Sequence, residues 1–315
     1  MVNYIVKRLG LAALTLFIVS LLSFSVLRIM PGSAAELMVT DQGYAEDVDR
    51  LRDQLGLNDP FHQQLLAWFA DIARFDLGDS LYSGDSITSE LVRRLPTTML
   101  LGSLILLVGW AVGVPLGILA AVRQGTFLDE ASRTVSVLFL AIPSFWLATM
   151  FIVFPSIWFG WAPPLRFVSF RSDPAAHLEL LLWPALIGGL PVSAGVVRVT
   201  RTLMLEVLRQ DYMRTARAKG LAPLAVLFRH GLRNAAPVLI TILGLQITTV
   251  ITGTVILEQV FAIPGMGRYI LEAAVRRDYP VVQAILLLSA TMLLMANLLV
   301  DLAYGYLDPR VRVTA

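Results

Sequence analysis

The sequence predicts an all-α integral membrane protein, and two observations carry this prediction. Hydrophobic residues make up 57% of the 315-residue chain and charged residues only 15%, whereas soluble domains have about 45–50% and about 25%. The apolar residues also gather into six runs that contain no charged side chain. Because a helix needs about 20 residues to cross the hydrocarbon core of a bilayer, these runs predict six transmembrane helices.

The six predicted spans differ in how clearly their ends are marked. They are residues 9–27, 96–122, 134–165, 180–197, 234–257 and 279–300. The third run is too long for one untilted helix, and Pro155, Pro163 and Pro164 predict that it leaves the membrane near Phe159. The first run could instead be a cleaved signal peptide, but its 19 residues exceed the about 7–15 apolar residues of such a segment.

Charges between the spans predict the topology. Lys7 and Arg8 precede the first span, and basic residues favour the cytoplasmic side. Residues 198–233 contain eight basic and two acidic residues, and the short tail contains Arg310 and Arg312. Residues 31–95 contain twelve of the 23 acidic residues and five of the 25 basic ones. Both termini and the 198–233 loop are therefore expected in the cytoplasm, with residues 31–95 outside.

The outer segment, residues 31–95, is too long for a simple connection. Its apolar spacing predicts short amphipathic helices at 47–55 and 61–75, separated by turns at 57–60 and 76–79. One face of the second helix would carry Leu65, Leu66, Phe69, Ile72 and Ala73. The segment is either a folded cap over the helix ends or a docking surface for an external partner.

The chain shows no sign of an active site. A P-loop needs Lys followed by Ser or Thr, whereas Lys7 is followed by Arg8 and Lys219 by Gly220. The chain has no cysteine. Its three histidines, His62, His177 and His230, lie far apart in the sequence. Each is expected at the surface or at an interface. A net charge of only +2 gives nucleic-acid binding little support. We therefore expect no catalytic residue, cofactor or metal site.

Uncharged spans also bear on the energy source. Proton-coupled carriers place ionisable residues within the bilayer, where each charge costs at least about 2.5–3.5 kcal/mol. The predicted spans carry only milder polar groups, which serve helix packing or line a path for a solute. Energy would then enter elsewhere, and the basic cytoplasmic loop is the best candidate.

This loop predicts two helices joined by a sharp turn. Residues 206–219 have helical spacing, with Leu205, Leu208, Tyr212 and Ala216 on one stripe. Gly220 is suited to a left-handed cap, and a second helix is expected to begin near Leu224. The alternative is a basic anchor that lies on the lipid headgroups.

Two motifs in this loop resemble a known family. Residues 211–221, DYMRTARAKGL, and 230–235, HGLRNA, resemble the EAA loop of ABC importer permeases. More narrowly, they resemble the form of this loop that is found in dipeptide, oligopeptide, glutathione and nickel importers. Arg214, Thr215 and Ala216 stand where the general motif has Glu-Ala-Ala, and Gly220 stands at its glycine. The glutamate is absent and Arg233 replaces a later proline, as in the peptide-type subfamily.

Further motifs extend the resemblance over nearly the whole chain. Residues 55–60, 76–80 and 94–98 resemble the outer segment of the B-type permease. Residues 258–268 resemble the family's outer loop before the last span, and the match is completed by residues 277–283 and 307–312.

The resemblance implies a type I ABC importer permease fold in a prokaryotic plasma (inner) membrane. It divides the chain into an N-terminal transmembrane helix (1–30), an extracytoplasmic segment (31–91), a core with five transmembrane helices (92–304) and a cytoplasmic tail (305–315). The implied partners are a second homologous, C-type permease, two ABC ATPase subunits that hold ATP and Mg²⁺, an extracytoplasmic solute-binding protein and the lipid bilayer.

It also implies two functional regions. A coupling helix that contacts the ATPase would use Asp211, Arg214, Thr215, Ala216, Lys219, Gly220 and Leu221. An outer gate loop would use Phe261, Pro264, Gly265, Gly267 and Arg268, with its glycines allowing a tight re-entrant backbone.

The implied function is ATP-driven import of peptides or similar small solutes, with this chain forming half of the path. Nickel chelates and glutathione are alternative substrates of the same kind of permease. A proton-coupled carrier and a membrane sensor or scaffold are alternatives of a different class, and the latter would need a cytoplasmic signalling domain.

Overall fold

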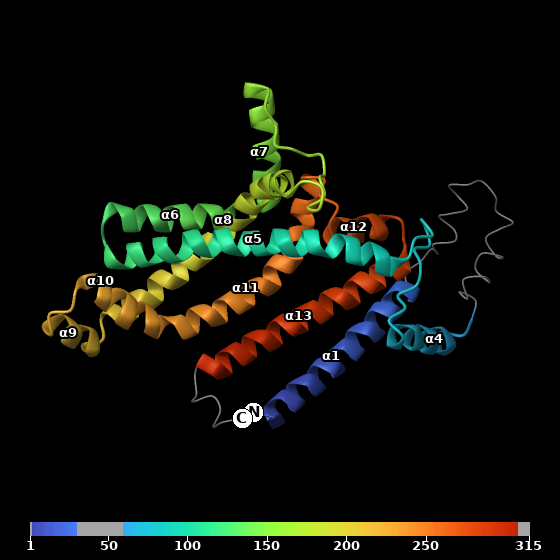
Figure 1. Cartoon of the computed structure of the whole chain (residues 1–315), viewed down its shortest axis with the longest axis horizontal. Coiled ribbons are helices and arrows are strands. Elements are labelled where there is room, and N and C mark those ends of the chain that lie inside the picture. The colour runs from blue at the N-terminus through green and yellow to red at the C-terminus, as the bar shows by residue number, and fades with distance from the viewer. Residues whose placement is uncertain (1, 30–58, 308–315) are drawn as a thin grey trace. The chain divides into compact units, whose positions relative to one another are not determined.

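The computed structural model of the chain describes residues 2–29 and 59–307 (Figure 1). These residues are mainly helical, which confirms the all-α prediction. They fall into two compact units. The first unit comprises Met1–Pro96 and Pro264–Leu294, and the second comprises Thr97–Ile263 and Met295–Ala315. The predicted helix at 47–55 lies outside the described residues.

Four helices of the described residues are long and apolar enough to cross a membrane, or five if one bent pair counts as a single span. The four are α1 (Val2–Ile29), α5 (Ile87–Val122), α8 (Pro174–Leu208) and α13 (Tyr279–Leu307). The run predicted at 234–257 forms α11 (Arg233–Val260). The helical nature of the predicted spans is confirmed, whereas the count of six is not.

The bent pair corresponds to the long third run. It consists of α6 (Phe127–Ala141) and α7 (Ser144–Phe159), which meet at an angle of 93° (Figure 1). The break occurs at Ile142, which is extended because the following Pro143 disfavours a helical conformation there. Helix α7 ends at Phe159, the position at which the run was predicted to leave the membrane, and Gly160 closes the helix at φ +62°. The break at Pro143 was not predicted.

Helix α8 begins at a strong helix-start signal. The Asp173 carboxylate accepts hydrogen bonds from the amides of Ala175 and Ala176, and Pro174 occupies the first turn. One turn later, His177 is buried, and its Nδ1 lies 2.7 Å from the carbonyl oxygen of Val168. The prediction of a surface or interfacial position for His177 is therefore wrong, because the preceding loop folds over the ring.

Helices α5 and α8 pack closely in the second unit. Three glycines spaced four apart on α5 face β-branched residues of α8. A Cβ added at Gly109, Gly113 or Gly117 would lie 2.3, 2.6 or 2.6 Å from an atom of Val192, Val196 or Thr200. Such small-residue stripes let helix backbones approach closely in membranes. The core of this unit then forms around Leu101, Ile105, Leu181, Ala185 and Leu257.

Helix α4 (Phe61–Ala73) packs on α1 in the first unit. Phe17 stacks on Phe69 at 5.5 Å between ring centroids, and Phe24 meets Phe61 and Trp68 at 5.5 and 5.4 Å. The predicted helix at 61–75 is confirmed. Its predicted face is partly wrong, because Leu66 is 68% exposed and the aromatic contacts use Trp68 instead.

The turn predicted at 76–79 is also confirmed. Gly78 has φ +75°, and its amide donates to Oδ1 of Asp76 at 2.9 Å. The turn leads into α5 through an isolated antiparallel bridge between Asp79 and Ser86. Of the other predicted turn, at 57–60, only residues 59 and 60 are described.

Candidate functional site

The predicted coupling helix is separate from the span before it. Helix α8 ends at Leu208, Gln210 is extended, and α9 (Asp211–Ala218) begins at the next residue. A continuous helix over 206–219 is therefore wrong. The break lets α9 fold back, so that its own apolar residues pack against Val207 and Leu208 at the end of α8.

The buried face of α9 is not the predicted stripe. Met213 is completely buried and Ala216 nearly so, and both pack with Val226. Tyr212, which was predicted on the packing face, is 41% exposed. The spacing of three between Met213 and Ala216 was the available signal, but it could be recognised only once α9 was separated from α8.

The turn after α9 has the predicted left-handed glycine. Gly220 has φ +75°, and its amide donates to the carbonyl oxygen of Arg217 at 3.0 Å. A Cβ added there would meet nothing within 4 Å. Glycine is therefore required here because of the backbone conformation, and not because neighbouring atoms would clash with a side chain.

The second helix of the loop begins with α10 (Pro223–Ala225), as predicted near Leu224. It continues as a seven-residue π-helix, η1 (Val226–Leu232), which leads into α11. The π-helix was not predicted. Single-turn π segments within helices are frequent at functional sites.

Most residues of the predicted coupling set lie on the surface of this loop. Asp211 and Arg214 are 3.6 Å apart, with side chains 96% and 76% exposed, and Thr215 donates to the carbonyl oxygen of Asp211. Lys219, Gly220 and Leu221 are also exposed. Ala216 is the exception, because it packs inside.

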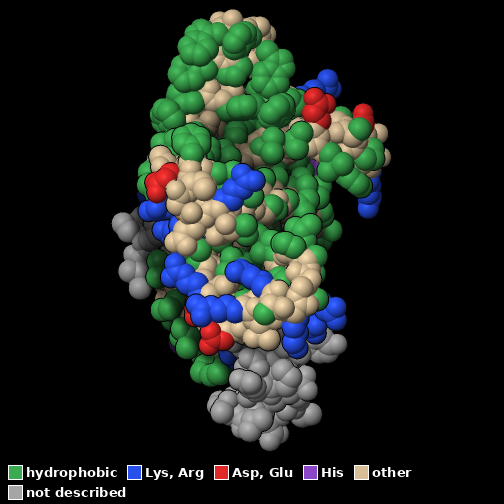
Figure 2. All heavy atoms as spheres, turned by 90° about the vertical axis from the view of Figure 1, so that its left-hand side faces the viewer, with side chains coloured by type: hydrophobic (Ala, Val, Ile, Leu, Met, Phe, Trp, Pro, Cys, Tyr) green, Lys and Arg blue, Asp and Glu red, His purple; other side chains and the backbone are tan. Residues whose placement is uncertain are grey.

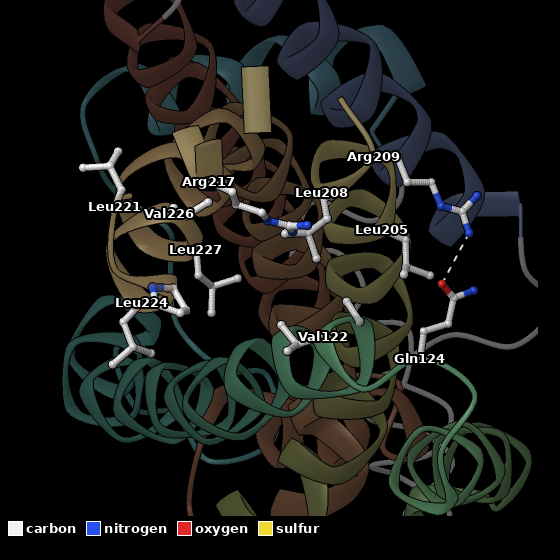
Figure 3. Close-up of a pocket in the computed structure, with 12 residues that line it drawn as sticks. Val122, Gln124, Leu205, Leu208, Arg209, Arg217, Leu221, Leu224, Val226 and Leu227 are labelled. Atoms are coloured by element: carbon white, nitrogen blue, oxygen red, sulfur yellow. Dashed lines mark hydrogen bonds between the residues drawn. The ribbon is translucent and has the colours of Figure 1, made fainter. Parts of the chain in front are cut away.

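Basic side chains gather on the face that carries α9 and α10 (Figure 2). The exposed ones from this loop include Arg214, Arg217, Lys219 and Arg229. A pocket of about 680 Å³ lies beside them, between the ends of α5 and α8 and the segment from α9 to η1 (Figure 3). Nothing in the sequence predicted this pocket.

A buried ion pair fixes the loop between α5 and α6. Arg201 of α8 binds Asp129 through two hydrogen bonds of 2.6 and 2.8 Å, and the amide of Gly125 donates to the same carboxylate. Asp129 is buried. The pair holds the turn that contains Gln124, which lines the pocket. Its partners are 72 residues apart, so sequence spacing gave no signal for it.

The predicted gate residues divide between the two units. Phe261 and Ile263 are buried in the core of the second unit. Pro264 and the residues after it belong to the first unit, where Gly265 precedes α12 (Met266–Val275). Gly267 lies buried in the first turn of α12, and Arg268 donates to Glu272 at 2.8 Å.

The backbone of this loop differs from the prediction in one respect. The left-handed residue is Ala262, with φ +52°, whereas Gly265 has φ −97°. The tight turn therefore does not rest on the glycines. Glu258, assigned to the loop from its sequence, is instead a buried residue of α11 that accepts a hydrogen bond from Thr98 Oγ1 at 2.8 Å.

A smaller, polar pocket of about 160 Å³ lies in the first unit. The buried Asp278 carboxylate accepts from Ser80 Oγ at 2.6 Å and from the amides of Leu81 and Tyr82 at 3.2 and 3.5 Å. This acid therefore ties the outer segment to the residues between α12 and α13.

Arginine–aromatic contacts line the same pocket. Arg94 lies 4.4 Å from the ring centroid of Tyr269, and Arg276 lies 3.9 Å from that of Tyr82. Burial, reinforced by Asp278 and Glu90, raises the pKa of Tyr269 to about 12. The described residues of the chain contain no group of three or more His, Cys, Asp or Glu side chains that could hold a metal ion.

Two family models cover the chain. The binding-protein-dependent transport system inner membrane component matches residues 113–313, and the N-terminal part of such membrane components matches residues 1–102. A probable peptide ABC transporter permease of Sinorhizobium fredii is 37% identical over 98% of this chain and 99% of its own.

Other relatives agree. The di/tripeptide permease DppB of Pseudomonas aeruginosa and the dipeptide permease DppB of Escherichia coli are each 37% identical, over 99% of both chains. These relatives are transport permeases rather than enzymes.

Solved structures support the fold. Two inward-facing structures of the MetNI methionine ABC transporter match 70% of this chain, with TM-scores of 0.53 and 0.57 at 20% and 17% identity. The matches cover 97% and 96% of the permease chains in those structures. The resemblance predicted from the motifs is thus confirmed: the chain belongs to the family of binding-protein-dependent transport system inner membrane components, and it is a multi-pass inner-membrane permease subunit of an ABC importer.

Proposed function

We propose that the chain forms half of a translocation path for peptides and that α9 is the element through which ATP hydrolysis drives it. The substrate class is the one that the names of the 37% identical relatives give. The observation that carries the coupling proposal is the two-sidedness of α9. One side is buried against α8 and η1, and the other presents exposed polar residues.

This arrangement suits the transmission of force. Met213 and Ala216 attach α9 to the end of α8 and to Val226 at the start of η1. Displacement of α9 by a partner would therefore move the end of α8 and the start of η1, which leads into α11, since interiors are close-packed and transmit strain. Asp211, Arg214, Thr215, Lys219 and Leu221 would supply the contact surface, and Gly220 would set its turn.

The proposed complex contains a second homologous permease, two ABC ATPase subunits and an external solute-binding protein. ATP and Mg²⁺ would be held by the ATPases. The charge distribution supports cytoplasmic termini and a cytoplasmic α9. The outer segment would then lie on the side of the binding protein. The turn from Phe261 to Arg268 would form part of the outer gate.

The test compares two glycines. Gly220 and Gly160 both have positive φ, at +75° and +62°, and both face open space. Valine tolerates this conformation poorly. We expect Gly220→Val to lose the ATPase subunits from the gently solubilised complex and to abolish most ATP-driven uptake, while keeping the second permease. Gly160→Val, at the end of α7, should keep the ATPases.

The readout is mass spectrometry of the proteins that co-purify with the tagged chain. The solute bound to a recovered binding protein would distinguish peptides from glutathione or nickel chelates. Equal ATPase recovery from both variants would disprove the coupling role of this turn. Solute movement by the chain alone in liposomes without ATP would instead favour a carrier.

A further inference from the structure

The pocket beside α9 combines an apolar wall with two arginines (Figure 3). Its leucines come from the end of α8 and from the segment after α9. They are Leu205, Leu208, Leu221, Leu224 and Leu227. Val122, at the end of α5, completes this wall, and the volume of about 680 Å³ lies within the range of small-molecule sites.

The charges of the pocket are all of one sign. Arg209 and Arg217 line it, and none of its twelve lining residues is an Asp or Glu. Arg209 donates to Gln124 Oε1 at 3.3 Å. Within the described part of the chain, the Arg217 side chain makes no hydrogen bond or ion pair, and Figure 3 shows it extending toward Leu208. The pocket therefore has cationic groups without a matching anion.

The apolar residues around the pocket are open to the surroundings. Leu224 is 69% exposed, and Val122 and Leu221 are also exposed. They lie beside the ends of α5 and α8, two of the helices long enough to cross a membrane. A ligand for this position must carry both a negative head and an apolar body. Basic pockets at the cytoplasmic ends of membrane helices have the chemistry to bind anionic lipid headgroups.

We propose that this pocket binds an anionic phospholipid of the surrounding leaflet. Its phosphate would lie against Arg217, Arg209 would add positive charge at the Gln124 side of the pocket, and its acyl chain would lie along the leucines and Val122. The lipid would fill the space between α5, the end of α8 and the α9–η1 segment. The lipid would therefore stabilise the position of α9, in addition to any contact that α9 makes with a protein partner.

The first experiment identifies the occupant directly. A photoreactive benzoylphenylalanine replaces Leu224 in the complete transporter, which is reconstituted into nanodiscs of phosphatidylcholine with phosphatidylglycerol. Illumination is expected to attach phosphatidylglycerol to this chain, detected by the mass of the adduct. An adduct with an ATPase or with the second permease in place of lipid would show that a protein fills the pocket and would overturn the proposal.

The second experiment tests the arginines. Native mass spectrometry measures how much phosphatidylglycerol stays bound to the complex during delipidation. Arginines near an anionic headgroup strengthen lipid binding, so the Arg209→Gln, Arg217→Gln double variant should bind phosphatidylglycerol at least about tenfold more weakly. Arg229→Gln is the matched control, because Arg229 is exposed on η1 but does not line the pocket.

Two results would overturn the lipid assignment. Equal retention of phosphatidylglycerol by the double variant and the control would place the lipid elsewhere. Full displacement by glycerophosphate, which has the phosphate but no acyl chain, would identify a site for a soluble anion. Because lipid binding is measured without uptake, failure of the coupling proposal would leave these outcomes unchanged.

Discussion

The loop that contains α9 and the pocket around Asp278 both carry charged residues, but these residues are exposed in the loop and buried or paired in the pocket. In the loop, Asp211 and Arg214 are exposed and 3.6 Å apart, and Arg217 faces a pocket with no carboxylate. In the first unit, Asp278 is buried and accepts three hydrogen bonds from the outer segment. Charges that are satisfied internally serve folding, whereas charges left at the surface are available to a partner. Asp278 is therefore expected to be needed for stability, and Asp211 and Arg214 for assembly.

The largest loss of stability should follow from breaking the Asp129–Arg201 ion pair, which holds the turn between α5 and α6. Asp129→Ala leaves the Arg201 side chain, which is only 18% exposed, without its partner, and breaking a buried pair in this way typically costs about 3–5 kcal/mol. We expect this change in the free energy of unfolding, measured by denaturant titration of the purified complex. The Asp129→Ala, Arg201→Met double variant should recover a large part of it. A double variant as unstable as the single one would show that the pair acts through more than charge burial.

Replacement of an aspartate by alanine should have different effects on stability in the polar pocket and in α9. Asp278→Ala leaves the Ser80 hydroxyl and the Leu81 amide without their acceptor, and each such group costs about 1–3 kcal/mol. We expect a loss of about 3 kcal/mol in the free energy of unfolding. Asp211→Ala should change stability little, because its exposed ion pair is weak. Similar losses for both variants would remove the distinction between the regions.

Two neighbouring residues of α9 should differ in the same way. Met213→Ala creates a cavity against Val226 and should cost about 2–3 kcal/mol in the free energy of unfolding. Tyr212→Ala should cost much less, because Tyr212 is largely exposed. A larger loss for Tyr212→Ala than for Met213→Ala would support the predicted stripe, in which Tyr212 lies on the packing face. Uptake measured alongside would show whether Tyr212 instead contributes to partner contact.

The smallest expected effect is a pH dependence in the polar pocket. The folded pKa of Tyr269 is about 12, above its value of about 10 in an unfolded chain. The unfolded state therefore releases this proton first as pH rises. The stabilisation is present below pH 10 and is lost through about pH 12. Wild type should thus lose more stability over this interval than Tyr269→Phe, and identical profiles would contradict the assignment.

Predictions from short-range patterns succeeded where the local chain decides the structure. The helical conformation of the spans follows from backbone hydrogen bonding in an apolar medium. The left-handed turn at Gly220 and the helix end near Phe159 follow from local backbone preference. The membrane class and the family could likewise be inferred from composition and ordered motifs. The coupling and gate roles stay predictions, because they depend on partner chains.

Predictions failed where a distant contact decided the outcome. The break between α8 and α9 is stabilised by Met213 packing on Val226, and no sequence period contains that contact. The Asp129–Arg201 and Ser80–Asp278 contacts join residues 72 and 198 positions apart. His177 is buried because a loop folds over it. Charge and hydropathy along one chain do not specify which distant side chains meet.

An all-helical membrane protein, its family and the turn at Gly220 could be inferred from the residues alone, because apolar runs, ordered motifs and glycine stereochemistry are local properties. The folded structure was needed to establish which face of α9 is buried, which charges are paired and where an apolar pocket opens beside two arginines. Burial and pairing depend on residues brought together from separate helices, and close packing of those helices selects one arrangement from many that the local pattern allows.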